Sequence, residues 1–343
     1  MMQKKKVRSS DTTETKQLVD FSTVFWHGAD LSKLKMHLID NIDLISAVPE
    51  RSAETISRLL SRRIEVREDE VLVTSGSTGA IHLIAKRTAG SNSLVISPTH
   101  QEFKVALARN GHQVTEIDSC VDITKLPLEG IQYCWLCTPN ISDGRLWSRT
   151  SLLTLFKENP NVTFIVDISM AAFVIEETLK PSDIKNHKNL ILVSSFSKAY
   201  NVPGMRVGYV VARKNIIAEL RESSTPCNIS AFAVEAIRFI LIHPAQFTLP
   251  ARKWHRSATE LKARLSAIDG LEILPSSTAF FVVRLLDMDA VKLNEYLMND
   301  CGMKVAVCTD GLELKPNEFR VNALDNESNR ALADAIATWM SNR

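Results

Sequence analysis

The sequence predicts an α/β protein: a large domain with a mostly parallel sheet sandwiched by helices, followed by a smaller α+β domain. Three observations predict this fold class. Short apolar runs typical of buried strands alternate with helix-like segments along the first two thirds of the chain. Past Gly208 the pattern changes to long amphipathic stretches and a few short strands. With 343 residues, of which 45% are hydrophobic, the chain is long enough to build both cores.

Apolar spacing places the elements of the large domain in order. Residues 54–64 carry isoleucine and leucine at helical spacing, which predicts a core-facing helix. Residues 70–76 predict a buried strand, and the helix after it begins at Ser77 and ends at Gly90. The alternation continues with strands predicted at 93–98, 133–140, 163–167 and 189–195 and with helices at 101–111 and 149–159. Strands that alternate with helices predict a parallel sheet with both faces covered.

The C-terminal part has a different pattern. Long amphipathic helices are predicted at 231–242 and 252–268, and short strands at 279–285 and 319–323 flank a helix at 293–300. The start of the chain is charged and has no apolar segment after it. The predicted organisation is a disordered leader over residues 1–17, an N-terminal segment over 18–48, a large domain over 49–242 and a small domain over 243–343.

The composition argues against several classes of partner. Lysine plus arginine nearly balance aspartate plus glutamate, which leaves a formal charge of +2 and predicts no nucleic-acid partner. No apolar run approaches the length of a membrane span, so we expect no membrane partner. Six scattered cysteines form no disulfide framework and favour a reducing, cytoplasmic location. The expected partner is a small molecule.

Cys134 and Cys137 form a CxxC pair inside the apolar run YCWLC. A zinc site needs further ligands, and no second Cys or His pair follows nearby. Packing inside a strand is therefore the favoured interpretation, and no metal site is predicted.

Polar groups lie at the ends of four of the predicted strands or directly after them. Because ligands bind beyond the carboxyl ends of the strands in such sheets, these groups predict one ligand site. They are the turn with Ser77 and Thr78, then Asn140, Asp167, and the stretch from Ser195 to Lys198.

The turn TSGSTGA, residues 74–80, suits a phosphate group. It would aim backbone N–H groups and the positive end of a helix dipole at one point. A plain connection in which Ser77 or Thr78 caps the helix is the alternative, and no Gly-Lys-Ser/Thr follows that would make it a P-loop. The role of Asp167 is equally undecided at this point: it could accept a hydrogen bond from a protonated ring nitrogen, but aspartate is also common at strand ends.

Lys198 has three interpretations. The stretch from Ser195 to Lys198 fits the S-x-x-K pattern of penicillin-recognising serine enzymes, but the chain has no Lys-Thr-Gly and no Ser-Asp-Asn. A solvent-exposed loop is the second interpretation. The third is a Schiff base between Lys198 and an aldehyde cofactor whose phosphate is bound by Ser195 and Arg206, which are the residue types that this chemistry needs.

Residues 194–209, SSFSKAYNVPGMRVGY, resemble the signature of class I/II aminotransferases of the pyridoxal 5'-phosphate (PLP) fold type I. The resemblance is greatest to the histidinol-phosphate aminotransferase branch with its relative threonine-phosphate decarboxylase, and it runs in order from about Asp20 to the C-terminus. It implies PLP as cofactor, with an amino acid or amino-acid phosphate and a 2-oxo acid as substrates. It also implies a homodimer in which the segment 18–48 packs on the small domain and on the partner subunit.

The resemblance implies a role for each matching residue. Lys198 matches the lysine that bonds the cofactor, and Asp167 matches the carboxylate that pairs with its pyridine nitrogen. These two are the predicted catalytic residues. Arg320 matches the arginine that binds the substrate α-carboxylate. The cofactor phosphate is assigned to Ser77, Thr78, Ser195 and Arg206.

Four positions depart from the family pattern. Met170 stands where relatives have the tyrosine of Asp-Glu-Ala-Tyr, so the hydroxyl that binds the cofactor's phenolic oxygen is missing there. Asn140 is predicted to bind that oxygen, although a gapless match puts Ile141 in its place. His100 matches the aromatic residue that stacks on the cofactor ring, and Val48 matches the tyrosine that reaches the partner's cofactor.

The predicted reaction is transamination, in which Lys198 moves a proton between the substrate α-carbon and the cofactor. A threonine-phosphate decarboxylase-like reaction is the first alternative, supported by Glu102 and Phe103 in PTHQEF. The second alternative, from another class, is a chain that binds PLP without turnover and serves as a regulatory or structural subunit. Which bond breaks depends on which one lies perpendicular to the ring, and the sequence does not specify that orientation.

Overall fold

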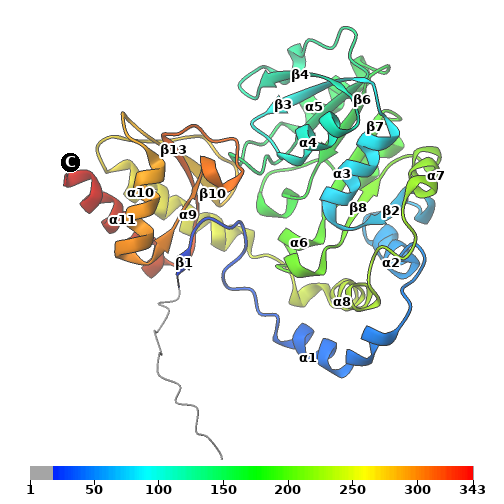
Figure 1. Ribbon diagram of the computed structural model, residues 1–343, viewed down its shortest axis with the longest axis horizontal. Helices are drawn as coiled ribbons and strands as arrows, with labels where there is room; N and C mark the ends of the chain where they lie inside the picture. Colours follow the sequence, from blue (N-terminus) through cyan, green and yellow to red (C-terminus); the bar gives the residue numbers. More distant parts are fainter. Residues whose placement is uncertain (1–17, 343) are drawn as a thin grey trace, which may run out of the picture.

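The computed structural model describes residues 18–342, and the leader predicted over residues 1–17 lies outside them. Figure 1 shows a larger part around one long sheet and a smaller part that contains the C-terminal helix. The two parts are joined by the N-terminal segment and by the connection from α8 (Ala231–Ile242) to α9 (Ala251–Ser266).

The larger part is built on a seven-stranded sheet in the order β2-β8-β7-β6-β5-β3-β4. Only β8 runs antiparallel to its neighbours, which confirms the predicted mostly parallel sheet. The strands are β2 (Val71–Thr74), β3 (Asn92–Ser97), β4 (Gln113–Asp118), β5 (Tyr133–Cys137), β6 (Thr163–Asp167), β7 (Leu190–Ser195) and β8 (Gly208–Val211).

Two of these strands were not predicted from the sequence. The edge strand β4 has the polar sequence QVTEID and is exposed along almost its whole length, so it lacks the apolar run of a buried strand. We expected the strands of the larger part to end before Gly208, but this boundary is too early. Residues 208–211 form β8, which lies between β2 and β7 in the sheet. An antiparallel neighbour needs no long crossover helix, and only a four-residue helix at Phe196–Ala199 and a short turn at Pro203–Met205 lie between β7 and β8, so no long helical pattern precedes β8 in the sequence.

Helices cover both faces of the sheet. One face packs on α3 (Gly76–Arg87), α4 (Glu102–Arg109) and α7 (Lys214–Ser223). The other face packs on α5 (Arg149–Glu158). Cys134 and Cys137 of β5 belong to these two different apolar clusters, so their thiols lie on opposite faces and cannot bind one metal ion together.

The smaller part has a four-stranded antiparallel sheet in the order β12-β13-β10-β9. Its apolar cluster includes the buried Trp254 and Phe281. The strands are β9 (Leu271–Ile273), β10 (Phe280–Leu285), β12 (Ala306–Val307) and β13 (Glu318–Asn322), and the helices are α9, α10 (Ala290–Tyr296) and α11 (Asn326–Ser341).

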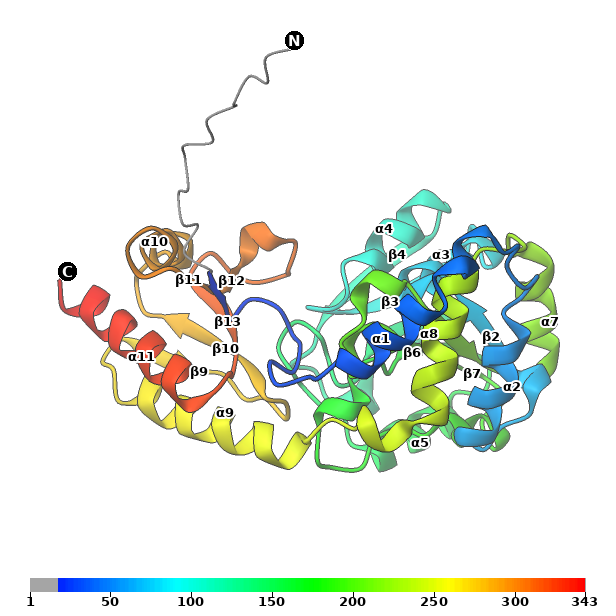
Figure 2. The ribbon, with the colours of Figure 1, turned by 90° about the horizontal axis from the view of Figure 1, so that it is seen from below.

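The N-terminal segment contacts both parts (Figure 2). Strand β1 (Val19–Asp20) pairs with β11 (Met303–Lys304), and the next apolar residues enter the cluster of the smaller part. The chain then crosses to the larger part, where α1 (Ser32–Asp40) packs on α8 and is followed by α2 (Glu54–Arg63). The two parts are therefore linked by non-covalent pairing as well as by the chain.

Within residues 18–342, no single helix has both the length and the apolar character of a membrane span. Residues 231–242 and 244–266 meet the length and composition criteria only when they are taken together, across a bend of 92°.

Candidate active site

One cavity brings together all the predicted cofactor residues except Asn140. It measures about 100 Å³ and lies where β2, β6 and β7 end. The predicted residues that line it are Ser77, Thr78, His100, Asp167, Ser195, Lys198 and Arg206, and the lining is completed by Cys137, Ile141, Ser169, Met170 and Ser197. The polar groups that follow separate strands in the sequence thus meet at one point, as the topology of the sheet requires.

One end of this cavity has the features of an anion site. The first turn of α3 presents Ser77 and Thr78 together with backbone N–H groups that no helical carbonyl can pair. Arg206 comes so close that a Cβ on Gly76 would lie 2.9 Å from its Nη2. A Cβ on Gly208 would lie 2.6 Å from the backbone nitrogen of Ser77, so only glycine allows β8 to pass the start of α3.

Two serines lie beside this end. Ser195 ends β7, and its Oγ accepts a hydrogen bond of 3.1 Å from the backbone N–H of Ser197. The Oγ of Ser197 is buried and has no hydrogen-bond partner among the described residues. A buried hydroxyl is normally paired, so an acceptor such as a phosphate oxygen fits this position.

Lys198 lies on α6 (Phe196–Ala199), one helical turn beyond β7. Burial, with smaller contributions from Arg320 and Arg206, lowers the pKa of Lys198 to about 8. The Nζ atom lies 4.3 Å from the ring centroid of Phe25, which comes from the N-terminal segment. Lys198 forms no ion pair within residues 18–342. An amine with these properties is available as a nucleophile near neutral pH.

Asp167 is buried at the end of β6. Its Oδ1 accepts a hydrogen bond of 2.7 Å from the backbone N–H of Ser169. Burial raises the pKa of Asp167, although His100 and the bonds from Ser169 oppose the shift. Since a buried carboxylate is stabilised by a nearby cation, this position fits a protonated ring nitrogen.

Arg320 lies on β13 of the smaller part and is buried outside the cavity lining. Its Nη1 donates to the carbonyl of Ile141 at 2.6 Å and its Nη2 to the carbonyl of Ser22 at 2.9 Å. Its Nε–H has no acceptor, and it forms no ion pair with a carboxylate in residues 18–342. Burial lowers the pKa of Arg320 to about 10, although Asp310 and Asp20 raise it. A buried guanidinium with free donors fits an anionic ligand.

Asn140 is not among the residues that line the cavity. Its Nδ2 donates to the carbonyl of Pro98 at 2.7 Å, and its Oδ1 accepts from the backbone N–H of Ser142 at 3.3 Å. Ile141 lines the cavity instead, as the gapless match places it. The prediction of Asn140 as a cofactor contact therefore lacks support in the geometry, because its amide already ties two loops together.

The sequence reasoning missed several groups around Lys198. Ser169 and Ser197 stand next to predicted residues, and both hydroxyls are buried without a partner in the described part of the chain. The sequence could have indicated both residues, because Ser169 comes shortly after a predicted strand end and Ser197 stands next to Lys198. Phe25 gave no local signal, because only the fold brings the N-terminal segment over Lys198.

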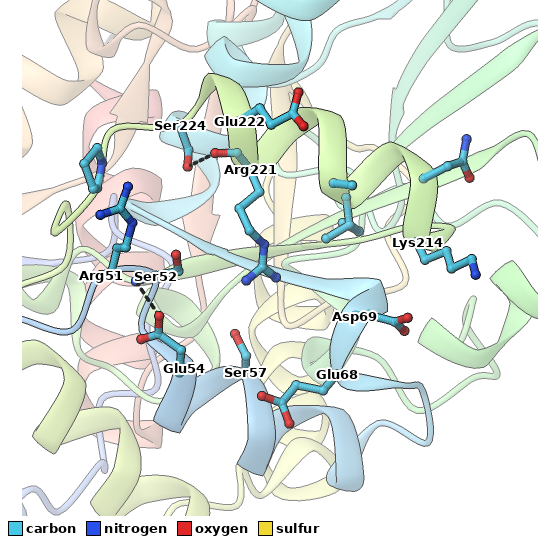
Figure 3. Close-up of a pocket in the computed structure, with 14 residues that line it drawn as sticks. Arg51, Ser52, Glu54, Ser57, Glu68, Asp69, Lys214, Arg221, Glu222 and Ser224 are labelled. Carbon is cyan, nitrogen blue, oxygen red and sulfur yellow. Dashed lines mark hydrogen bonds between the residues drawn. The ribbon is translucent and has the colours of Figure 1, made fainter.

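A larger hollow, of about 960 Å³, lies elsewhere on the larger part, between α2 and α7 (Figure 3). Charged residues of both signs line it, among them Arg51, Glu54, Glu68 and Arg221. It shares no residue with the cavity around Lys198. The smaller cavity is the candidate site, because the nucleophile, the buried carboxylate and the anion-binding turn meet there.

Comparisons with known proteins agree with this geometry. A family model described as aminotransferase class I and II matches residues 28–336. The solved L-threonine-O-3-phosphate decarboxylase from Porphyromonas gingivalis has a TM-score of 0.92 and 38% identity, and the match covers 94% of this chain and 100% of that one. Histidinol-phosphate aminotransferase from Sulfurimonas denitrificans is 25% identical, covering 83% of this chain and 81% of the relative. Threonine-phosphate decarboxylase from Salmonella typhimurium is 27% identical, covering 64% of each.

These matches confirm the predicted family and its fold class. The matched length spans both the large sheet and most of the C-terminal part, so the likeness is not limited to the lysine motif. The chain therefore belongs to the aminotransferase class I and II family, and its cofactor is PLP.

Proposed function

We propose that the protein is a PLP-dependent decarboxylase that acts on L-threonine O-3-phosphate or a closely related phosphorylated amino acid. The observation that carries the proposal is the 38% identity to the Porphyromonas gingivalis decarboxylase across 94% of the chain. The cavity around Lys198 supports it, because it combines an anion site, a nucleophilic amine and a buried carboxylate.

The residues of the cavity divide between the two ends of the cofactor. In this proposal Ser77, Thr78, Ser195 and Arg206 hold the phosphate. Asp167 and His100 also line the cavity, where Asp167 would bind the protonated ring nitrogen and His100 would lie against the ring. When bound, PLP supplies an electron sink for the electron pair left at the substrate α-carbon.

Lys198 and Arg320 would handle the substrate. Lys198 would hold the cofactor covalently through its amine, and the same amine would serve to carry a proton to or from the substrate α-carbon. Arg320 orients the α-carboxylate with the N–H donors that Ile141 and Ser22 do not use. By orienting the α-carboxylate, Arg320 would contribute to which bond at the substrate α-carbon breaks.

Transamination is the second candidate function. Histidinol-phosphate aminotransferases match most of the chain at 22–27% identity, and the same lysine and carboxylate serve either reaction. The two reactions are distinguished by their products. Holoprotein incubated with L-threonine O-3-phosphate should release carbon dioxide, and added 2-oxoglutarate should yield no glutamate. Glutamate without carbon dioxide would instead support transamination. Neither product, with PLP bound to Lys198, would support the non-catalytic alternative.

The pH dependence of cofactor capture tests the state of Lys198. Only the neutral amine attacks an aldehyde, and burial lowers the pKa of Lys198 to about 8. The rate at which the apoprotein captures PLP should therefore rise with pH through about 8 and level off above it. Capture is followed by the visible absorbance and by borohydride trapping at short times. A rate that keeps rising to about 10, as for an ordinary lysine, would contradict the assignment.

We also propose that the protein is a homodimer. Five apolar residues at intervals of three form an exposed stripe along α1 and the turn after it, namely Met36, Ile39, Ile42, Ile45 and Val48. Ile45 and Val48 are 81% and 87% exposed. Several exposed apolar side chains close together in one segment are typical of a protein–protein interface, and the resemblance implies that this segment packs on the partner subunit.

Substitution of Ile45 tests the homodimer. Ile45→Asp would place a carboxylate in the apolar interface, so the dimer dissociation constant should rise on the order of 100-fold. Sedimentation velocity at micromolar concentration should show a dimer for the unmodified protein and a monomer for the variant. Leu286→Asp is the matched control, because Leu286 is exposed and apolar but lies outside the stripe. A monomeric unmodified protein would contradict the proposal.

A further inference from the structure

The loop between β3 and α4 carries His100 and is held in place at consecutive residues. From the larger part, Asn140 Nδ2 donates to the carbonyl of Pro98 at 2.7 Å, and Ser142 Oγ donates to the carbonyl of Thr99 at 3.0 Å. The backbone N–H of Glu102 donates to His100 Nδ1 at 3.2 Å. With Nδ1 accepting, this hydrogen bond assigns the proton of the neutral ring to Nε2.

One side chain from the smaller part also holds this loop. Glu313 lies between β12 and β13, and its Oε2 accepts a hydrogen bond of 3.0 Å from the backbone N–H of Thr99. Its Oε1 lies 2.7 Å from Lys104 Nζ, at the start of α4. Gly311, also in the smaller part, lies close to the same loop: a Cβ on Gly311 would lie 3.0 Å from Gln101 Oε1. Glu313 thus bridges both sides of His100.

The contact to Thr99 is partly buried. Thr99 is 2% exposed, while the Glu313 side chain is 21% exposed, so the backbone N–H of Thr99 depends on this carboxylate for its hydrogen bond at the edge of the solvent. An unpaired buried donor destabilises its conformation more than a lost surface contact does. Loss of Glu313 should therefore displace the loop locally, one residue away from a ring that lines the cavity.

We propose that Glu313 is a positioning residue: from the smaller part, it fixes the loop of His100 and so sets how that ring lies against the cofactor. The inference rests on the cofactor placement proposed above. It makes the geometry around the cofactor ring depend on docking between the two parts of the chain. Arg320 makes a second link of this kind, because it binds the carbonyl of Ile141, between the two residues that hold Pro98 and Thr99.

The test uses PLP-loaded protein and reads the cofactor as well as activity. Visible circular dichroism of bound PLP reports its asymmetric surroundings, and fluorescence titration gives its dissociation constant. Glu313→Ala should clearly reduce the dichroic band and raise the dissociation constant about three- to tenfold. Glu313→Gln keeps an acceptor for the Thr99 N–H and should restore most of both readouts.

A double-mutant cycle separates positioning from simple destabilisation. In a His100→Ala background, adding Glu313→Ala should change the dichroism and the dissociation constant by less than about twofold, because the ring it positions is gone. Glu116→Gln is the matched control, since Glu116 also pairs with Lys104, at 2.5 Å, but does not contact Thr99. It should leave both readouts unchanged.

Three outcomes would overturn the inference. Glu313→Ala could leave the dichroism intact, could lower only the melting temperature, or could have the same effect with and without His100. An unmodified protein that shows no dichroic band from PLP on Lys198 would instead contradict the proposed function, so the two failures are distinguishable.

Discussion

Lys198→Ala should abolish turnover and covalent attachment of PLP. Removing the amine that bonds the cofactor and carries the proton should lower kcat on the order of 10⁴-fold or more. The variant should still bind PLP non-covalently, because Ser77, Ser195 and Arg206 at the phosphate end remain. Borohydride reduction followed by digestion and mass spectrometry locates the attachment, and the reaction products are measured in parallel.

The matched control for this experiment is Lys262→Ala. Lys262 is also partly buried, and burial lowers its pKa, but it lies on α9 and binds the carbonyl of Ser276. It should retain attachment and turnover. A label on another lysine of the unmodified protein, or attachment that survives in Lys198→Ala, would show that the nucleophile has been misassigned.

Arg206→Ala and Arg320→Ala should fail in different ways. Arg206 lines the cavity beside the start of α3, so its loss should weaken PLP binding on the order of tenfold or more. Arg320 lies outside that lining, so its variant should lose much less PLP affinity than Arg206→Ala, although it also removes the hydrogen bond to the carbonyl of Ile141. Its kcat/KM should fall on the order of 100-fold, because two charge-assisted bonds to the carboxylate are lost.

Titrations of PLP and of substrate, both followed by cofactor absorbance, distinguish these effects. Arg320→Lys is the informative companion, since lysine keeps the charge but not the planar fork, and it should recover only part of the activity. The thermal stability of each apoprotein controls for misfolding, because Arg320 also binds the carbonyls of Ile141 and Ser22. If Arg320→Ala loses PLP as readily as Arg206→Ala, the division of labour between the two arginines is wrong.

The large sheet was predictable because its buried strands are short apolar runs with helices between them. Residues 163–167 and 189–195 match β6 and β7 closely for that reason. The polar edge strand β4 and the four-residue β8 gave no comparable signal. Whether a short segment pairs as a strand depends on its neighbours in space, and the antiparallel return of β8 is such a case.

The residues of the candidate site also differ in whether the sequence could predict them. Asp167 and Ser195 are the last residues of β6 and β7, and Lys198 follows β7 on α6, so the topology of the sheet brings them together. Asn140 and Ile141 lie in an irregular loop, where the sequence does not specify which of two adjacent side chains faces the cavity. Phe25 contacts Lys198 and Glu313 contacts Thr99 from distant parts of the chain, so no local sequence pattern predicts either contact.

The pairing of β1 with β11 constrains the order in which the parts of the protein can fold. Residues 19–20 leave the ribosome long before residues 303–304, so they have no partner until those residues are synthesised. All strands of the larger sheet have been synthesised by residue 211, so this sheet can form much earlier. The N-terminal segment therefore stays unpaired while the larger part folds. A fragment that begins at residue 243 would also lack Phe21 and Trp26 from its apolar cluster. We therefore expect that no single cut between the two parts yields a stable C-terminal fragment.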